Sequence, residues 1–256
     1  MAGSRYFTAA RLISIGLIAV GFVAVAQNST ERPPDGGSRE VLVSILIPSL
    51  PNAPFSAVVN TESIRQLANG TSITLKNHRA IARDRAGRIF QERRLLVPED
   101  GKHESVVTQI EISDPVTHEL FICVPKEQVC QVEDFDAPPF QAPKTAAVHG
   151  GANLQDLGKQ SVGGVETIGT RETVVIEAGK IGNDSPIEVQ REYWYSAQLG
   201  VNLISRLQDP RVGVQNFEVS DIALTDPDVK LFKVSSKMKV IDLRAQKERP
   251  GADEVK

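Results

Sequence analysis

Short runs of alternating apolar and polar residues, separated by turn residues, dominate this 256-residue chain from Phe55 to Thr225. In Phe55–Leu67 and Ser72–Arg83, successive side chains change character with the period of two that is typical of a β-strand. Asn69-Gly70 lies between these two runs and strongly favours a tight hairpin turn. Because no helical period runs through this region, we expect antiparallel strands joined by local turns.

This rhythm predicts a mainly β fold with few helices. We expect a single curved antiparallel sheet, a half-barrel or open barrel of about eleven strands, within a domain that spans residues 41–234. The β-branched run Val41–Ile47 is the expected first strand, and Leu231–Val234 is the expected last one.

Two segments depart from the strand rhythm. Residues 134–156 hold three prolines and a Gly-Gly pair, and we interpret them as a long irregular insertion that is either a lid or a disordered excursion. Residues 235–256 are charged and predict a polar tail, with a short helix near Val240–Gln246.

The beginning of the chain predicts export. Arg5 and Arg11 precede the apolar run Leu12–Val25, and small residues end this run at Ala26. We interpret residues 1–26 as a signal peptide that is cleaved after Ala26, followed by a flexible linker over residues 27–40. A retained membrane anchor is the alternative, but the apolar run is shorter than the roughly twenty residues that span a bilayer. The mature protein is therefore expected in the periplasm or outside the cell, without a stable membrane span.

The charge balance argues against a nucleic-acid partner. Removal of residues 1–26 takes away two basic residues and no acidic ones, which changes the formal charge from −3 to −5. Proteins that bind nucleic acid usually carry a basic surface, so we expect no such partner.

The two cysteines predict a disulfide. Cys123 and Cys130 flank a hairpin whose turn is centred on Lys126-Glu127, and this register places the two cysteines opposite each other. An exported protein lies in a compartment where disulfides persist. Two unpaired buried thiols are the alternative.

The residues that usually carry catalysis form no pattern here. His78, His103, His118 and His149 are scattered, and none belongs to a zinc-binding H-E-x-x-H motif. The chain has no G-x-S-x-G motif and no phosphate-binding glycine loop. We therefore predict no catalytic residues, no metal site and no cofactor, and a protein that is not an enzyme.

A basic cluster lies on the strands near residue 83. Arg79, Arg83, Arg88 and Arg93 are the candidates for a patch that binds anionic headgroups or a polyanionic envelope polymer. The alternative is a solvated hairpin face whose charges protect a sheet edge.

An aromatic cluster suggests a second candidate surface. Alternation places Tyr193 and Tyr195 on one face of a strand and Trp194 on the other. With Phe217 from a later strand, these residues are the candidates for contact with an apolar ligand. Packing in the protein core is the alternative explanation for all four.

The stretch from Trp194 to Phe232 contains an aromatic strand end, a hairpin turn between an aspartate and a glycine, and an Asp-Pro segment before a phenylalanine. The residues that make up this pattern are Trp194, Leu199, Leu203, Asp209, Gly213, Phe217, Asp226, Pro227 and Phe232. In this pattern the last fifth of the chain resembles the lipoprotein-carrier superfamily, the LolA-, LolB- and RseB-like proteins, and the remainder resembles it by strand rhythm. The front half also resembles an uncharacterised family of exported acidobacterial proteins.

The resemblance implies a curved sheet that wraps an apolar cavity, in proteins that bind lipid-modified proteins or sense envelope stress. We therefore expect a non-enzymatic envelope protein that holds an apolar or lipidated ligand, or another envelope protein, on its concave face. Its expected partners are a lipid, a lipoprotein or another envelope protein. The alternative is a structural module that acts through the basic hairpin and has no small-molecule pocket.

Overall fold

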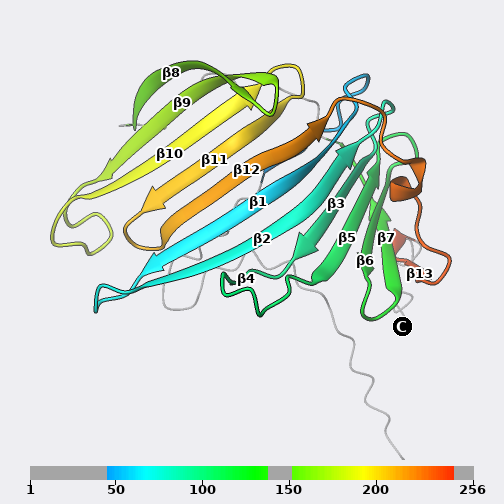
Figure 1. The fold of residues 1–256 in the computed structure, drawn as a ribbon, viewed down its shortest axis with the longest axis horizontal. Helices are drawn as coiled ribbons and strands as arrows, with labels where there is room; N and C mark the ends of the chain where they lie inside the picture. Colours follow the sequence, from blue (N-terminus) through cyan, green and yellow to red (C-terminus); the bar gives the residue numbers. More distant parts are fainter. Residues whose placement is uncertain (1–44, 138–151, 245–256) are drawn as a thin grey trace, which may run out of the picture. The chain divides into compact units, whose positions relative to one another are not determined.

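The structure, a computed structural model, describes residues 45–137 and 152–244. The predicted signal peptide and linker lie outside the described residues. One open, curved sheet of 13 strands accounts for the fold (Figure 1). The elements are β1 (Phe55–Gln66), β2 (Ser72–Arg83), β3 (Ile89–Arg94), β4 (Val97–Pro98), β5 (Val107–Asp114), β6 (Glu119–Val124), β7 (Val129–Asp134), β8 (Ala152–Val162), β9 (Val165–Ile176), β10 (Ile187–Ser196), β11 (Val201–Asp209), β12 (Gly213–Ala223), the 3₁₀ helix η1 (Val229–Phe232) and β13 (Lys239–Asp242).

The strand order is β13-β7-β6-β5-β3-β2-β1-β12-β11-β10-β9-β8, and the short β4 pairs with β2. Strands β1 and β12 are neighbours at the centre of the sheet although most of the domain separates them in sequence. All pairs are antiparallel except β13 with β7. The predicted mainly β fold, with one curved sheet and few helices, is confirmed, as is the hairpin at Asn69-Gly70.

Several predicted boundaries were wrong. Residues 45–47 form no strand; Ile45 and Ile47 are buried and Leu46 is exposed, so their alternation reflects packing onto a sheet rather than pairing within it. The last strand expected at Leu231–Val234 is instead η1 and the residues that follow it. The irregular insertion predicted over 134–156 overlaps two strands, because β7 reaches Asp134 and β8 begins at Ala152; residues 138–151 lie outside the described residues.

The predicted polar tail also contains structure. Lys239–Asp242 form β13 instead of a helix and add a parallel strand beside β7. The amide of Lys239 donates to the Gln128 carbonyl at 2.7 Å, and that of Leu243 donates to the Val132 carbonyl at 2.9 Å. This strand covers an edge that β7 would otherwise expose.

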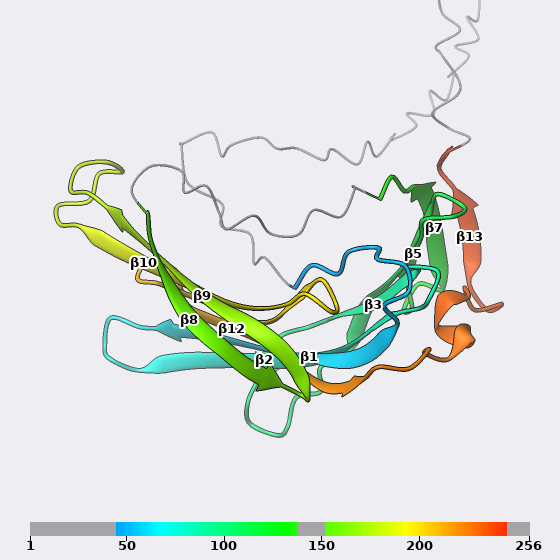
Figure 2. The ribbon, with the colours of Figure 1, turned by 90° about the horizontal axis from the view of Figure 1, so that it is seen from above.

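The two faces of the curved sheet can be assigned from register. Figure 2 shows that the segment before β1 lies on the concave side. Its Ile45 and Ile47 pack in one apolar cluster with Phe55 and Val59 of β1, so these residues mark the concave face. Directly opposed residues in neighbouring strands share a face, which extends the assignment from β1 to the strands on both sides.

The main core is the apolar cluster that lies largely against the concave face. It consists of Ile45, Ile47, Phe55, Ala57, Val59, Ile81, Ile89, Val162, Val165, Trp194, Leu199, Val201, Leu203, Ile204, Phe217 and Val219. The turn between β8 and β9 closes one side of it, because a Cβ at Gly163 would lie only 2.9 Å from Ile222 Cδ1. The core therefore fills the part of the concave face that lies near the beginning of β1.

A buried arginine joins the connecting segments to this core. Arg83 is 0% exposed, and its guanidinium donates to the carbonyls of Ala53 at 2.9 Å, Pro48 at 2.9 Å and Leu199 at 2.7 Å. It also lies over the Phe55 ring, with 5.0 Å between Cζ and the ring centroid. Burial lowers the pKa of Arg83 to about 10, so the group stays charged at neutral pH. One cation thus satisfies three carbonyls from segments far apart in sequence.

A second apolar cluster lies on the convex face. Ala82, Phe90, Ile112 and Phe232 form it, and Leu231 and Val234 pack against it. The segment that carries η1 therefore covers the convex side of β3 and β5 on its way to β13 (Figure 2). Arg88 lies 5.1 Å from the centroid of the Phe232 ring, which adds a cation–π contact to this cover.

We predict that Arg83→Met lowers the free energy of unfolding by about 2–4 kcal/mol. The methionine fills much of the volume but leaves three buried carbonyls without their donor, each at a cost of about 1 kcal/mol or more. Urea denaturation followed by circular dichroism measures the effect. Arg85→Met is the control, because Arg85 is exposed and its guanidinium pairs with the exposed Asp226; an equal loss in both variants would contradict the role given to Arg83.

Candidate functional site

The concave face beyond the main core carries a set of partly covered apolar side chains, which we call the concave rows. Cross-strand register places them together: Leu75 and Leu207 lie in one row, on either side of Ser63 and Gln215. The apolar members of the concave rows are Ile73, Leu75, Val174, Ile176, Ile187, Val189, Tyr193 and Leu207. Only Val189 is fully buried, while Ile73 is 45% exposed. Four strands, β2, β9, β10 and β11, therefore present half-covered apolar side chains on the inner side of the sheet.

The four aromatic candidates separate into two environments. Tyr193 and Phe217 lie in one row on the concave face, on either side of Ser205. Phe217 and Trp194 are buried in the main core, whereas Tyr193 and Tyr195 are half-buried. Burial raises the pKa of both tyrosines, so both hydroxyls remain protonated at neutral pH.

Trp194 packs against the backbone of the neighbouring strand. Its position opposite Gly169 leaves no room for a side chain there, because a Cβ on Gly169 would lie 2.6 Å from Trp194 Cζ3. Its indole nitrogen donates to Glu192 at 2.9 Å. The side chain is therefore a structural anchor between β9 and β10.

The four candidate arginines do not form one exposed patch, which corrects the expectation drawn from the sequence. Arg79 and Arg83 are buried on the concave face. Arg88 pairs with Asp84 at 2.6 Å. Arg93 pairs with Glu111 through two hydrogen bonds of 2.9 Å. Strand alternation alone could not distinguish a solvated hairpin face from one that faces the inside of a curved sheet.

Arg79 and Arg93 belong to a polar network on the concave side of β3 and β5. Gln91 and Gln109 donate to the same Glu111 carboxylate at 2.7 and 2.8 Å. Arg79 reaches the Gln91 amide oxygen at 3.4 Å. Burial and the positive charge of Arg93 lower the pKa of Arg79 to about 10, against the opposing effect of Glu111 and Glu92. At this network the concave face changes from apolar to polar.

The convex face carries a polar ladder that the sequence did not reveal. Five residues lie directly opposite one another on β10, β11, β12, β1 and β2: Glu192, Arg206, Asn216, Glu62 and Lys76. Arg206 pairs with Glu192 at 3.0 Å, Asn216 donates to Glu62 at 2.9 Å, and Lys76 lies 3.2 Å from Glu62. From the sequence one could see only that polar residues occupy alternate positions in each strand. Their alignment across five strands could be known only once the register of those strands was known.

The ladder holds its carboxylates in the charged form. The hydrogen bond from Asn216 and the contacts with Lys76 lower the pKa of Glu62. Burial alone would raise the pKa of Glu192, but hydrogen bonds from Trp194 and Arg171 and the charge of Arg206 outweigh it and lower that pKa. Glu99, with Glu62, raises the pKa of Lys76.

A groove of about 670 Å³ lies along the polar ladder. The loop after β4 forms its wall and projects from the convex side (Figure 2). The groove is lined by Asn60, Thr61, Glu62, Lys76, Asn77, His78, Val97, His103, Ser105, Arg206, Asn216, Phe217 and Glu218. Most of the lining residues carry polar side chains, although carbon atoms contribute more than half of the lining surface.

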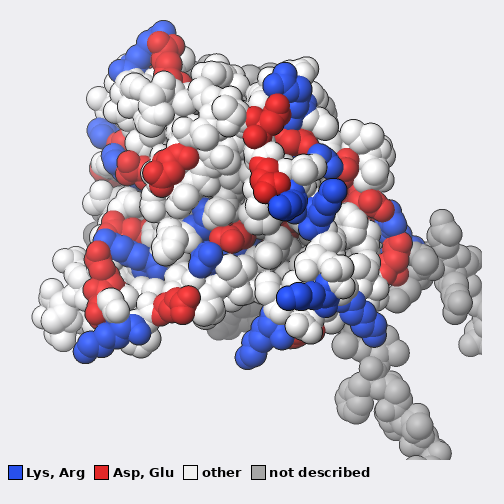
Figure 3. Space-filling view, turned by 45° about the vertical axis from the view of Figure 1, so that its right-hand side comes forward, with Lys and Arg blue, Asp and Glu red and all other residues white. Residues whose placement is uncertain are grey.

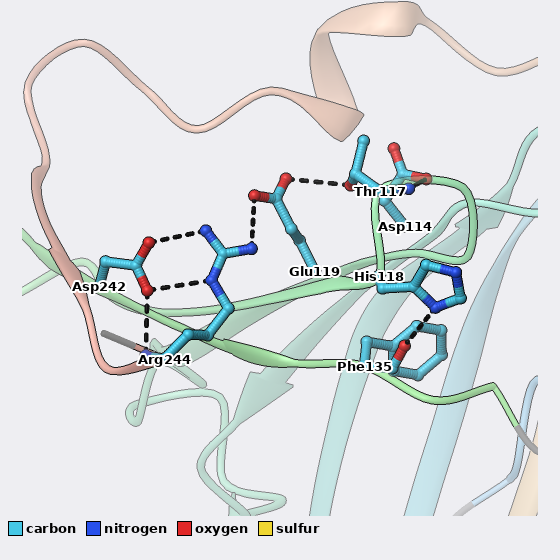
Figure 4. A network of polar contacts seen from close by, with 7 residues as sticks. All are labelled: Asp114, Thr117, His118, Glu119, Phe135, Asp242 and Arg244. Carbon is cyan, nitrogen blue, oxygen red and sulfur yellow. Dashed lines mark hydrogen bonds and ion pairs between the residues drawn. The ribbon is translucent and has the colours of Figure 1, made fainter. Parts of the chain in front are cut away.

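The predicted disulfide is confirmed. Cys123 and Cys130 are directly opposed in β6 and β7, with 3.9 Å between their Cα atoms, and a four-residue turn joins the strands. Figure 4 shows how the C-terminal strand is held beside this hairpin. Arg244 bridges Asp242 at 2.6 Å and Glu119 at 2.9 Å, and Thr117 donates to the other oxygen of Glu119 at 3.0 Å.

Within the described residues, no group of three or more His, Cys, Asp or Glu side chains is arranged to hold a metal ion. The same part of the chain contains no helix with the length and hydrophobicity that a membrane span needs.

Comparisons with known proteins give fold likeness only. No protein-family model and no curated protein sequence matches the chain. Among solved structures, a chain from the complex of MucA and MucB of Pseudomonas aeruginosa is 14% identical with a TM-score of 0.40, and the alignment covers 73% of this chain and 58% of that one. This chain therefore spans less than two thirds of that neighbour.

Two further neighbours are similar over most of their own length. A LolA-superfamily protein from Nitrosomonas europaea is 11% identical with a TM-score of 0.28, covering 72% of this chain and 91% of the other. The lipoprotein LppX of Mycobacterium tuberculosis is 12% identical with a TM-score of 0.26, covering 69% and 88%. With all three TM-scores below 0.5, the likeness carries no argument about function.

We predict that Gly169→Ala lowers the free energy of unfolding by about 1–3 kcal/mol, because the new methyl group overlaps the Trp194 ring. Chemical denaturation of a double-mutant cycle with Trp194→Leu tests the cause. In the Trp194→Leu background, Gly169→Ala should lower the free energy of unfolding much less than it does in the wild type. A cost that is the same in both backgrounds would show that the ring contact is not responsible.

We also predict that Glu192 makes stability depend on acidic pH. Its pKa is lowered in the folded state, so its stabilising contribution is complete above the unfolded pKa of about 4.3 and is lost as pH falls through the folded value. Between about pH 5 and pH 3, the unfolding free energy of Glu192→Gln should therefore fall less steeply than that of the wild type. The control is Glu188→Gln, an exposed position on the same strand; matching slopes for wild type and Glu192→Gln would refute the prediction.

Proposed function

We propose that this chain is an exported, non-enzymatic binding protein of the cell envelope that holds an apolar or lipidated ligand against the concave rows. The observation that carries the proposal is the half-covered apolar surface beyond the main core, to which β2, β9, β10 and β11 all contribute. The composition of residues 1–26 supports export.

The chemistry of the surface favours an acyl chain over a polar ligand. Leu75, Leu207 and the aliphatic side chains of β9 and β10 offer apolar surface, and burial of each methylene group of a ligand contributes about 0.8 kcal/mol. Polar side chains, among them Gln215 and the pair of Arg191 with Glu172, lie between these apolar groups on the same face. The main core occupies the other part of the concave face, with Ile45, Ile47 and Leu199 already packed there. The ligand is therefore expected on the part of the face that carries the concave rows.

We predict that full-length protein binds dansyl-labelled fatty acids with an affinity that rises roughly tenfold for every two added methylene groups. Fluorescence titration with eight-, ten- and twelve-carbon probes measures this dependence. Val174→Asp should weaken binding at least tenfold, because Val174 lies in the concave rows opposite Val189.

Val175→Asp is a matched control, since Val175 is the next residue of the same strand, faces the convex side and is 44% exposed. Thermal melts of both variants establish that they are folded. An affinity that does not change with chain length, or an equal loss in the two variants, would refute the proposal.

A further inference from the structure

The groove on the convex face has a chemistry of its own and does not depend on the proposed function. Beside the polar ladder runs a second row of directly opposed residues, Glu218, Asn60 and His78. Three neighbouring strands lie about 4.8 Å apart, so this row is roughly 10 Å long. The two rows are adjacent on the convex face. The loop after β4 lies beside them and contributes His103 and Ser105 to the groove.

The positive charges of the groove are already neutralised. Lys76 contacts Glu99 at 2.7 Å as well as Glu62, and Arg206 contacts Glu192 at 3.0 Å. His103 lies 2.8 Å from Asp100. Figure 3 likewise shows basic and acidic side chains interspersed on this side of the molecule instead of gathered into fields of one sign. A ligand selected by net charge would find no strong field here.

Unused hydrogen-bonding groups remain beside these pairs. The side chains of Glu218 and His78 both line the groove, and neither has a hydrogen-bond or ion-pair partner among the residues that the structure describes. Both side chains are exposed and lie on the convex face, so a ligand in the groove can reach them.

We propose that this groove binds a neutral saccharide. A sugar hydroxyl can donate and accept at once, which suits a surface where carboxylate and amide oxygens alternate with imidazole, ammonium and guanidinium groups. The carboxylate of Glu218 can accept from two hydroxyls, and the imidazole of His78 can donate or accept. An apolar ligand would leave these polar groups desolvated without partners, which makes it a poor occupant.

The test is a printed array of neutral and uronic-acid-containing oligosaccharides, probed with full-length protein, followed by calorimetry with the neutral glycan that gives the highest signal. We expect binding to neutral glycans, a loss of at least tenfold in affinity in both His78→Ala and Glu218→Gln, and little change between low and high salt. Glu166→Gln is the matched control, because Glu166 is exposed and outside the groove, and it should bind as the wild type does.

Three outcomes would overturn the proposal. One is an array on which no neutral glycan exceeds the signal of the His78→Ala, Glu218→Gln double variant. Another is binding that both single variants leave unchanged. The third is binding that is confined to acidic glycans and lost at high salt, which would indicate an ionic ligand. Fatty-acid binding by the concave rows is measured separately, so failure of either proposal leaves the other standing.

Discussion

The backbone ladder between strands is the constraint on which the other features of this protein depend. In the sheet order from β7 at one side, through β1 and β12, to β8 at the other edge, every pair of neighbouring strands is antiparallel. Each pairing decides which residues lie side by side on one face. Because side chains alternate along a strand, a shift of one residue in any pairing would move every side chain of that strand to the opposite face. The concave rows and the polar ladder therefore both exist only in this register.

Packing on the concave face explains how this register is held. Arg83 connects the segment before β1 and the turn after β10 to the same strand, so the curved sheet is tied where its two halves meet. A buried guanidinium is costly unless its donors are satisfied, and here three carbonyls and the Phe55 ring provide that satisfaction. On the convex face, the segment that carries η1 is held to the sheet in a similar way, because Phe232 packs against Ala82, Phe90 and Ile112.

The two faces consequently offer different chemistry on one sheet. The concave rows are apolar and half-covered, and they suit a ligand held by burial of hydrocarbon. The polar ladder and its groove are charge-compensated, and they suit a ligand held by hydrogen bonds. The same strands, β10, β11 and β2, contribute to both surfaces through alternate residues. A curved sheet that is covered on neither face as a whole can present both at once.

Local features of the sequence were predicted well because they depend on neighbouring residues. The hairpin at Asn69-Gly70, the pairing of Cys123 with Cys130, and the separation of Tyr193 from Trp194 all follow from turn chemistry or from the period of a single strand. The arginine patch was wrong for the opposite reason. Whether Arg79 and Arg83 contact water or protein depends on the curvature of the sheet and, for Arg83, on Pro48 and Ala53, which lie 35 and 30 residues away in sequence.

The sequence by itself thus determined the class of the fold, its local turns and its disulfide, because alternation and turn propensity act over a few residues. Only the tertiary structure decided which alternate residues face inward, that β13 pairs with β7, and that Glu62, Lys76, Asn216, Arg206 and Glu192 align across five strands. Those outcomes depend on long-range strand register and on how far the sheet bends, and neither is encoded in the pattern of any one strand.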